Sequence, residues 1–193
     1  SIVQDWLTGR GWMDDQDRGR FVALVGDAEL DEGNIYEALI EGVKHDIRGL
    51  WWILDYNRQS LDAVSADGMF ERFDDIFRAC GWRVVELKYG KRLAAALAKD
   101  KALKTWFDGL PNADLSALHY QGGAAIRARL EADLGKKAAI LKSDDAALLA
   151  LFSDLGGHCM DSLVEAFDSA SADDTPTLFI AWTIKGHGLP FAG

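Results

Sequence analysis

Four short apolar segments, separated by stretches with helical periodicity, constrain the fold of this chain more than any other feature. They are residues 20–26, 50–56, 83–87 and 177–182. Three of the four are nearly unbroken apolar runs, a pattern typical of strands that are covered on both faces. We therefore expect these segments to form one buried sheet.

The stretches between the first three segments predict helices. Between residues 34 and 48 apolar side chains recur at four-residue steps, and between 68 and 80 a similar stripe precedes Gly81, a typical helix terminator. Strand, helix and strand at this spacing indicate right-handed parallel crossovers. The predicted fold class is α/β, with three layers (α/β/α) and a mainly parallel sheet.

Residues 90–170 have a helical pattern almost throughout, with alanine-rich stretches. No Pro/Gly/Ser-rich linker separates them from the rest, so we interpret them as a long connection before the last strand. The prediction is one domain over residues 1–193. Since the sequence lacks an initiator methionine and stops after a glycine-rich turn, we also expect it to be a fragment of a larger multidomain enzyme.

Composition excludes several classes of protein. The net charge of −10 argues against nucleic-acid binding, which needs clustered lysine and arginine. No run reaches the roughly 18 apolar residues of a membrane span, and the first residues do not have the pattern of a signal peptide. Cys80 and Cys159 lack a C-x-x-C spacing, so we predict two reduced thiols in a cytoplasmic protein.

Polar residues follow the first two apolar segments. Asp27 comes directly after Gly26, and Asn57 follows the second segment 30 residues later. The carboxyl ends of parallel strands form the ligand crevice of open α/β sheets. Mg²⁺ binds oxygen ligands and often combines one or two carboxylates with substrate phosphates. The two segments therefore predict a magnesium-diphosphate site, although an aspartate in a turn or helix cap has the same local pattern.

Four segments together resemble one family. They are Gly26-Asp-Ala-Glu-Leu-Asp-Glu, Asp55-Tyr-Asn-Arg-Gln-Ser-Leu-Asp62, Gly156-Gly-His-Cys159 and Thr183-Ile-Lys-Gly-His-Gly188. In this order they are similar to G-D-G-E-M-D-E, N-x-N-L-Q-R-L-D, G-G-H-D and T-I-K-G-Y-G of thiamine diphosphate enzymes. The resemblance is to the homodimeric type of the pyruvate dehydrogenase decarboxylating component, in the transketolase superfamily, and it extends from Arg20 to the end of the chain.

The resemblance implies the cofactors thiamine diphosphate and Mg²⁺, and a role for each matching residue. Asp27, the Asn57 amide oxygen and the Gln59 backbone carbonyl would hold the metal. Glu32 would take the catalytic position, in an acidic tunnel between two active sites, although a solvated acidic helix start explains it equally well. Lys185 would approach the phosphates, against the alternative of a surface lysine. The implied cofactor-binding residues are Gly26, Ala28, Glu29, Leu61 and Lys185.

The sequence departs from the family pattern at two positions. Ala28 replaces the second glycine of G-D-G, which would cost about 1 kcal/mol or more if the backbone there had a positive φ. Either φ is negative at Ala28 or cofactor affinity suffers. Tyr56 replaces the first asparagine of the pair, which leaves Asn57 as the amide able to reach the metal.

The resemblance also implies an activity and partners. The enzyme would be an acetyl-transferring 2-oxoacid dehydrogenase that acts on a small 2-oxoacid, with a second subunit of a homodimer and a dihydrolipoyl acyltransferase as partners. A transketolase, or a non-catalytic fragment with weakened cofactor binding, remain the alternatives.

The chain alone is expected to be inactive. In the family it resembles, the glutamate that activates the cofactor comes from another domain, which this chain does not contain. It is also expected to bind the cofactor weakly or to self-associate through an exposed patch around Trp51, Trp52, Trp82 and Trp182.

Overall fold

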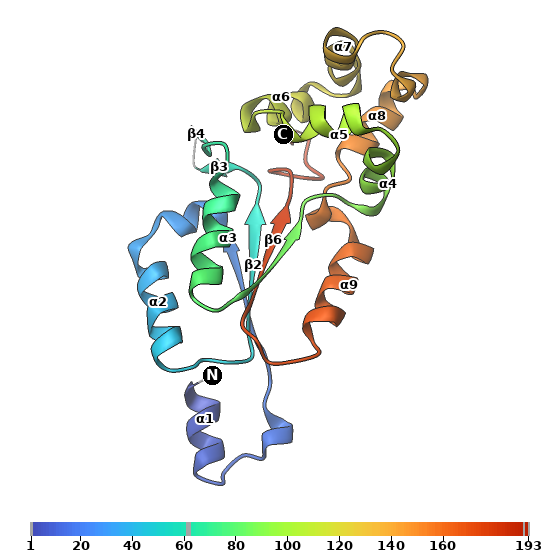
Figure 1. Ribbon diagram of the computed structural model, residues 1–193. Helices are drawn as coiled ribbons and strands as arrows, with labels where there is room; N and C mark the ends of the chain where they lie inside the picture. Colours follow the sequence, from blue (N-terminus) through green and yellow to red (C-terminus); the bar gives the residue numbers. More distant parts are fainter. Residues whose placement is uncertain (1, 61–62, 191, 193) are drawn as a thin grey trace. The chain divides into compact units, whose positions relative to one another are not determined.

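The structure is a computed structural model that describes residues 2–60, 63–190 and 192 (Figure 1). Helices and strands alternate in the first part of the chain, and helices dominate between the third strand of the main sheet and the last. In chain order the elements are α1 (Ile2–Gly9), η1 (Asp15–Asp17), β1 (Phe21–Gly26), η2 (Asp27–Asp31), α2 (Gly33–Lys44), β2 (Leu50–Tyr56), β3 (Gln59–Ser60), β4 (Ala63–Val64), α3 (Met69–Ala79), β5 (Arg83–Leu87), α4 (Lys91–Lys99), α5 (Lys101–Asp108), α6 (Asn112–Gln121), α7 (Gly123–Leu134), η3 (Ala139–Lys142), α8 (Asp145–Phe152), η4 (Gly156–His158), α9 (Met160–Ala170) and β6 (Thr177–Trp182).

The main sheet confirms the predicted fold class. Its four strands are parallel and lie in the order β1-β2-β6-β5, and they coincide with the four apolar segments to within one residue. The register of the first pair places Phe21 beside Leu50 and Gly26 beside Asp55. The carboxyl ends of β1 and β2 therefore lie side by side.

Two adjacent tryptophans show why both faces of the sheet are covered. Successive side chains of a strand point to opposite faces. Trp52 contacts Phe77 of α3, with ring centroids 5.6 Å apart, whereas Trp51 stacks on Phe167 of α9 at 5.5 Å. Figure 1 shows α2 and α3 on one side of the strands and α9 on the other. These contacts produce the predicted three layers.

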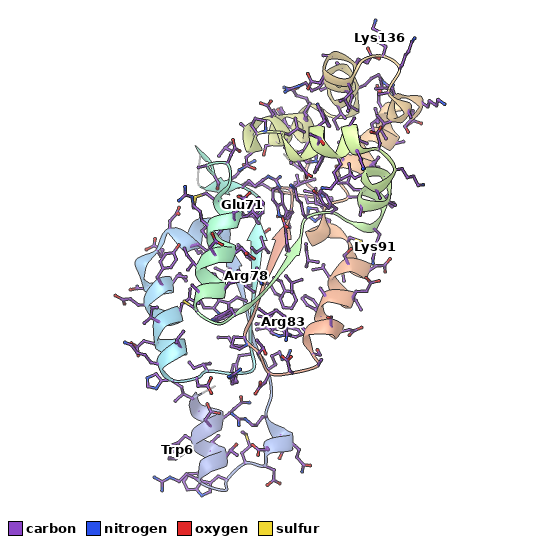
Figure 2. All side chains as sticks on the ribbon, in the orientation of Figure 1. Trp6, Glu71, Arg78, Arg83, Lys91 and Lys136 are labelled. Atoms are coloured by element: carbon purple, nitrogen blue, oxygen red, sulfur yellow. The ribbon has the colours of Figure 1, made fainter. Side chains whose placement is uncertain are left out.

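The expected tryptophan patch is wrong. Trp51, Trp82 and Trp182 are buried, and Trp52 is half-buried between aromatic neighbours. The burial agrees with the unbroken apolar pattern of these strands, which predicted cover on both faces, and not with the expected patch. Exposed tryptophans occur instead near the amino terminus, at Trp6 and Trp12, which are 50% and 69% exposed (Figure 2).

Helix boundaries follow local backbone geometry. The helix predicted for residues 34–48 ends earlier, at Lys44, because Asp46 adopts a positive φ of 44° that ends the helical turn. Ile47 lies beyond the helix, and its backbone N–H donates to the Gly42 carbonyl at 3.0 Å. The next helix, α3, ends where predicted, and Gly81 follows it with φ of 79°.

The chain divides into two compact units, each built from three segments. The sheet unit comprises Ser1–Tyr56, Gly68–Glu86 and Val164–Ala181. The helical unit comprises Asn57–Asp67, Leu87–Leu163 and Trp182–Gly193. The predicted helices between 90 and 170 are confirmed, and most of them lie in the helical unit. Whether the whole chain folds as one domain, as predicted, is not tested by this division.

Backbone segments of the helical unit approach one another closely at several glycines, among them Gly156. The Asp154 carboxylate accepts hydrogen bonds from the backbone N–H groups of Arg92 and Leu93, at 2.9 and 3.1 Å, and so caps the start of α4.

Two residues later, a Cβ added to Gly156 would lie 2.2 Å from the backbone oxygen of Leu87. Glycine is therefore required at position 156, the first residue of the Gly-Gly-His motif.

Candidate functional site

Asp27 begins the turn that follows β1. Its side chain is only 5% exposed, and its Oδ1 accepts a hydrogen bond of 2.9 Å from the backbone N–H of Ala28. In the same turn Glu29 Oε1 accepts from the backbone N–H of Gly26 at 3.2 Å. Carboxylate oxygens therefore accept the backbone N–H groups of Gly26 and Ala28, two of the residues implied to bind the cofactor.

The backbone at Ala28 resolves one of the two alternatives from the sequence. Among the described residues other than glycine, positive φ values occur at Asp46 and Arg58 alone. Ala28 lies in the 3₁₀ turn η2 at negative φ, so its Cβ causes no backbone strain. The Gly-to-Ala departure is therefore compatible with the geometry of this turn.

Asn57 and Gln59 lie in the turn that opens the helical unit. Asn57 Oδ1 accepts a hydrogen bond of 3.0 Å from the backbone N–H of Gln59. This bond fixes the amide oxygen and leaves it a second lone pair for a cation. The Gln59 side chain donates to Ser116 Oγ at 3.4 Å, so the side chain contacts α6 and only its carbonyl is assigned to the metal.

The proposed metal ligands are divided between the two units. Asp27 belongs to the sheet unit, and Asn57 and Gln59 belong to the helical unit, which starts one peptide bond beyond Tyr56. Within the described residues no group of three or more His, Cys, Asp and Glu side chains could hold a metal ion. The predicted ligands are of another kind: one carboxylate, one amide oxygen and one backbone carbonyl. Their joint role in binding a metal stays a prediction.

Arg58 lies between the two predicted ligands and was missed by sequence reasoning. It is 1% exposed, has a φ of 67°, and its guanidinium carbon lies 5.2 Å from the ring centre of Trp182. A non-glycine residue in the left-handed region is uncommon and often marks a functional turn. No pattern in the sequence distinguishes this buried arginine from a surface one.

The remaining predicted site residues have simpler surroundings. Glu32 is exposed, precedes α2 and makes no capping hydrogen bond, so its geometry is that of a solvated helix start. Glu29 is also exposed. Lys185 is exposed in the turn after β6. Leu61 lies outside the described residues.

Two histidines hold the segment that carries Lys185. His158 Nε2 accepts a hydrogen bond of 2.8 Å from the backbone N–H of Ile184, and its ring stacks on His187 with centroids 3.9 Å apart. His158 therefore has a structural role in this segment. His158 must carry its proton on Nδ1 to accept this bond.

His119 of α6 is a buried histidine of the helical unit whose pKa is strongly lowered. Burial lowers its pKa to about 4, the Phe152 carbonyl raises it, and the charges of Arg58, His158 and His187 lower it again. Its Nε2 lies 3.0 Å from that carbonyl. The neutral imidazole therefore donates to Phe152.

We expect the free energy of unfolding to fall as pH decreases from about 6.5 to about 4. In this window the unfolded chain binds a proton that folded His119 does not, so acidification favours unfolding. At about 1.4 kcal/mol per pH unit the loss is about 3 kcal/mol. Denaturant unfolding at several pH values measures it.

His119→Phe is the control for this prediction, since it removes the titrating group. Its stability should change much less over the same window. Asp108 and Asp173, whose pKa values hydrogen bonds lower from 3.8 to about 2, make their own contribution mainly below pH 4, where the unfolded chain takes up their protons. Equal slopes in both proteins would contradict the assignment to His119.

One cavity of the sheet unit lies away from the predicted site. A cavity of about 480 Å³ in the sheet unit is lined at the amino ends of β1 and β2 by Arg18, Arg20, Arg48 and Asp174, among others. The cofactor motif begins at the carboxyl end of the same strands. Parallel sheets bind ligands at that end, so we assign no cofactor role to this cavity. Among the described residues no helix is long and apolar enough to cross a membrane.

Comparisons with known proteins match almost the whole chain. It is 28% identical to the pyruvate dehydrogenase E1 component of Cupriavidus necator over 197 aligned residues, covering 97% of this chain and 21% of that protein. The proteins of the same name from Escherichia coli K12 and Mycobacterium tuberculosis are each 27% identical and cover 95% of the chain. No family model matches. The chain spans about a fifth of the length of these relatives. The resemblance indicated by the four motifs is thus confirmed: over nearly its whole length the chain is similar to one segment of the pyruvate dehydrogenase E1 components.

Proposed function

We propose that this chain binds the diphosphate of thiamine diphosphate through Mg²⁺, as part of a 2-oxoacid dehydrogenase that acts on pyruvate. The observation that carries the proposal is the buried carboxylate of Asp27, placed directly after β1 where Gly26 lies beside Asp55 of β2. A carboxylate at the carboxyl edge of a parallel sheet is a suitable ligand for a hard cation.

The donor set fits the proposed group. Asp27 supplies a carboxylate, Asn57 an amide oxygen and Gln59 a backbone carbonyl, and all three are the oxygen ligands that Mg²⁺ prefers. The backbone N–H groups of Gly26 and Ala28 already donate to carboxylate oxygens, which are chemical analogues of phosphate oxygens. In the proposed complex these donors turn to the diphosphate, and Lys185 adds a positive charge.

The wider proposal follows the relatives. Thiamine diphosphate supplies the decarboxylation chemistry, and the protein supplies binding and orientation. We propose a second subunit and a dihydrolipoyl acyltransferase as partners, with Glu32 in an acidic passage and Leu61 against the cofactor. Cys80 and Cys159 are free thiols, which suits a reducing compartment such as the cytoplasm.

The test is thermal unfolding of the enzyme that contains this chain, with Mg²⁺ and thiamine diphosphate added separately and together. Both together should raise the midpoint, because one carboxylate leaves the cation in need of phosphate oxygens. The expected stabilisation is about 2.7 kcal/mol at a hundredfold excess over the dissociation constant. Mg²⁺ alone giving the same shift would contradict a shared site.

The same experiment separates the alternatives. A complete lack of stabilisation by the two ligands together would favour a non-catalytic fragment. If the cofactor binds, assays with pyruvate and with a ketose phosphate on the enzyme that contains this chain distinguish a dehydrogenase from a transketolase.

A further inference from the structure

Lys185 occupies the corner of a tight turn in the helical unit. The backbone N–H of His187 donates to the Ile184 carbonyl at 3.1 Å and closes this turn. Gly186 takes its third position with a φ of 68°, as in a type II turn, where that position favours glycine. Lys185 takes the second position and is exposed. Where its ammonium group lies therefore depends on how the two ends of the turn are held.

One side chain holds both ends of the turn. His158 Nε2 accepts a hydrogen bond of 2.8 Å from the N–H of Ile184, the first residue of the turn. The same imidazole stacks on the ring of His187, the last residue, with centroids 3.9 Å apart and an angle of 20° between the planes. His158 belongs to η4, whose first residue, Gly156, packs on backbone atoms of Leu87. The ring thus joins the turn to a closely packed segment.

We propose that His158 is a positioning residue of the diphosphate site and holds the Lys185 turn only while its imidazole is neutral. This inference rests on the cofactor site proposed above. A neutral imidazole can accept a hydrogen bond at Nε2, whereas an imidazolium donates at both nitrogens and cannot accept the Ile184 N–H. Protonation of His158 therefore releases the first end of the turn, and the affinity for the diphosphate falls as the pH decreases.

The surroundings of the stacked rings add to this effect. The charged and titratable groups near them are Arg58, His119, Asp154, Cys159 and Lys185. Besides burial, the charges of Arg58 and of both stacked histidines lower the pKa of His119, so these four side chains share one electrostatic environment. A proton added to either stacked ring enters a region that already holds the buried cation of Arg58. The Asp154 carboxylate is engaged by backbone N–H groups of α4.

The first experiment measures the Ile184 hydrogen bond without the cofactor, by hydrogen exchange of the ligand-free enzyme that contains this chain. His158→Phe keeps a ring for stacking but removes the acceptor, so exchange of the Ile184 amide at about pH 8 should be about 10-fold faster. His158→Gln places an acceptor oxygen as many bonds from the backbone as Nε2 and cannot titrate. Its exchange should be close to that of the unchanged enzyme.

The second experiment is calorimetric titration with thiamine diphosphate at saturating Mg²⁺. At about pH 8 His158→Phe should raise the dissociation constant by about 10- to 100-fold, as the loss of residues that orient ligands does, and His158→Gln should bind almost normally. Down to about pH 5.5 the dissociation constant of the unchanged enzyme should rise about 3-fold or more beyond that of His158→Gln. Protonation of the diphosphate affects both proteins equally and cancels. His119 stays neutral in this range because its pKa is about 4.

A double-mutant cycle tests whether His158 acts through Lys185. In a Lys185→Ala background, His158→Phe should raise the dissociation constant by less than about 3-fold, since the cation that it positions is gone. His45→Phe is the matched control. It replaces an exposed histidine at the end of α2, in the sheet unit, and should bind the cofactor with normal affinity and normal pH dependence.

The outcomes separate this inference from the cofactor site on which it rests. If the unchanged enzyme binds no thiamine diphosphate at any pH, the proposed function fails and the inference fails with it. If the cofactor binds, an unchanged affinity in His158→Phe, a full loss in the Lys185→Ala background, or the same pH dependence with and without His158→Gln would overturn the inference alone. Should His158→Phe fail to fold, the comparison with His158→Gln decides.

Discussion

Replacing Asp27 by alanine is expected to weaken Mg²⁺-dependent binding of thiamine diphosphate by more than about 100-fold. Asp27 is the one side-chain carboxylate assigned to the metal, and it is buried at the end of β1. Losing residues that merely orient metal ligands costs 10–100-fold, and losing a charged ligand should cost more. Calorimetric titration of the cofactor at saturating Mg²⁺ measures the change.

Two variants separate the metal role from the structure of the turn. Asp27→Asn keeps an oxygen that accepts from the Ala28 N–H and removes the charge, so it should also bind poorly while the turn persists. Asp31→Ala removes an exposed charge from the same turn and should have little effect. Gln59→Ala should also lose little, because the assigned ligand is a backbone carbonyl. Equal losses in the Asp27 and Gln59 variants would show that this assignment is wrong.

Gly156→Ala is expected to destabilise the folded chain strongly. Its new Cβ would lie 2.2 Å from the Leu87 backbone oxygen, closer than any ordinary contact. Two backbone segments must separate, and we expect the free energy of unfolding to fall by about 3 kcal/mol. Chemical denaturation followed by circular dichroism provides the measurement.

Gly42→Ala is the matched control for this substitution. Gly42 lies inside α2, and an added Cβ would have no atom within 4 Å. Alanine is the better helix former by about 0.5–1 kcal/mol, so this variant should be as stable as the parent or more stable. A stable Gly156→Ala variant would show that the segment following α8 has room to move.

The strands were predictable because their signal is local and strong. Apolar runs of five to seven residues identified β1, β2, β5 and β6 to within one residue. The end of α2 was not predictable, because the apolar spacing continues to Ile47 while the positive φ of Asp46 ends the helix before it. The expected tryptophan patch conflicted with the predicted cover of both sheet faces, and the packing of Trp51 on α9 and of Trp52 on α3 follows that cover.

For the candidate site, the sequence identified positions but not surroundings. The motif spacing located Asp27 and Asn57 at the ends of neighbouring strands. Because open parallel sheets bind ligands at the carboxyl ends of their strands, the predicted topology also indicated this edge. Burial of Arg58 and the helical turn at Ala28 depend on backbone angles that composition does not specify. The neutral state of His119 near neutral pH depends on its burial in the folded chain, which lowers its pKa more than the hydrogen bond to Phe152, 33 residues away, raises it.

The interleaved path of the chain has a consequence for proteolysis. Strands β2, β6 and β5 are neighbours in the sheet, and each passes from the sheet unit to the helical unit at its carboxyl end, after Tyr56, Ala181 and Glu86. The chain returns between Asp67 and Gly68 and between Leu163 and Val164. A protease that nicks one of these connections leaves the others intact. Two domains joined by a single linker are separated by one cut, but these two units are joined by several connections and are not.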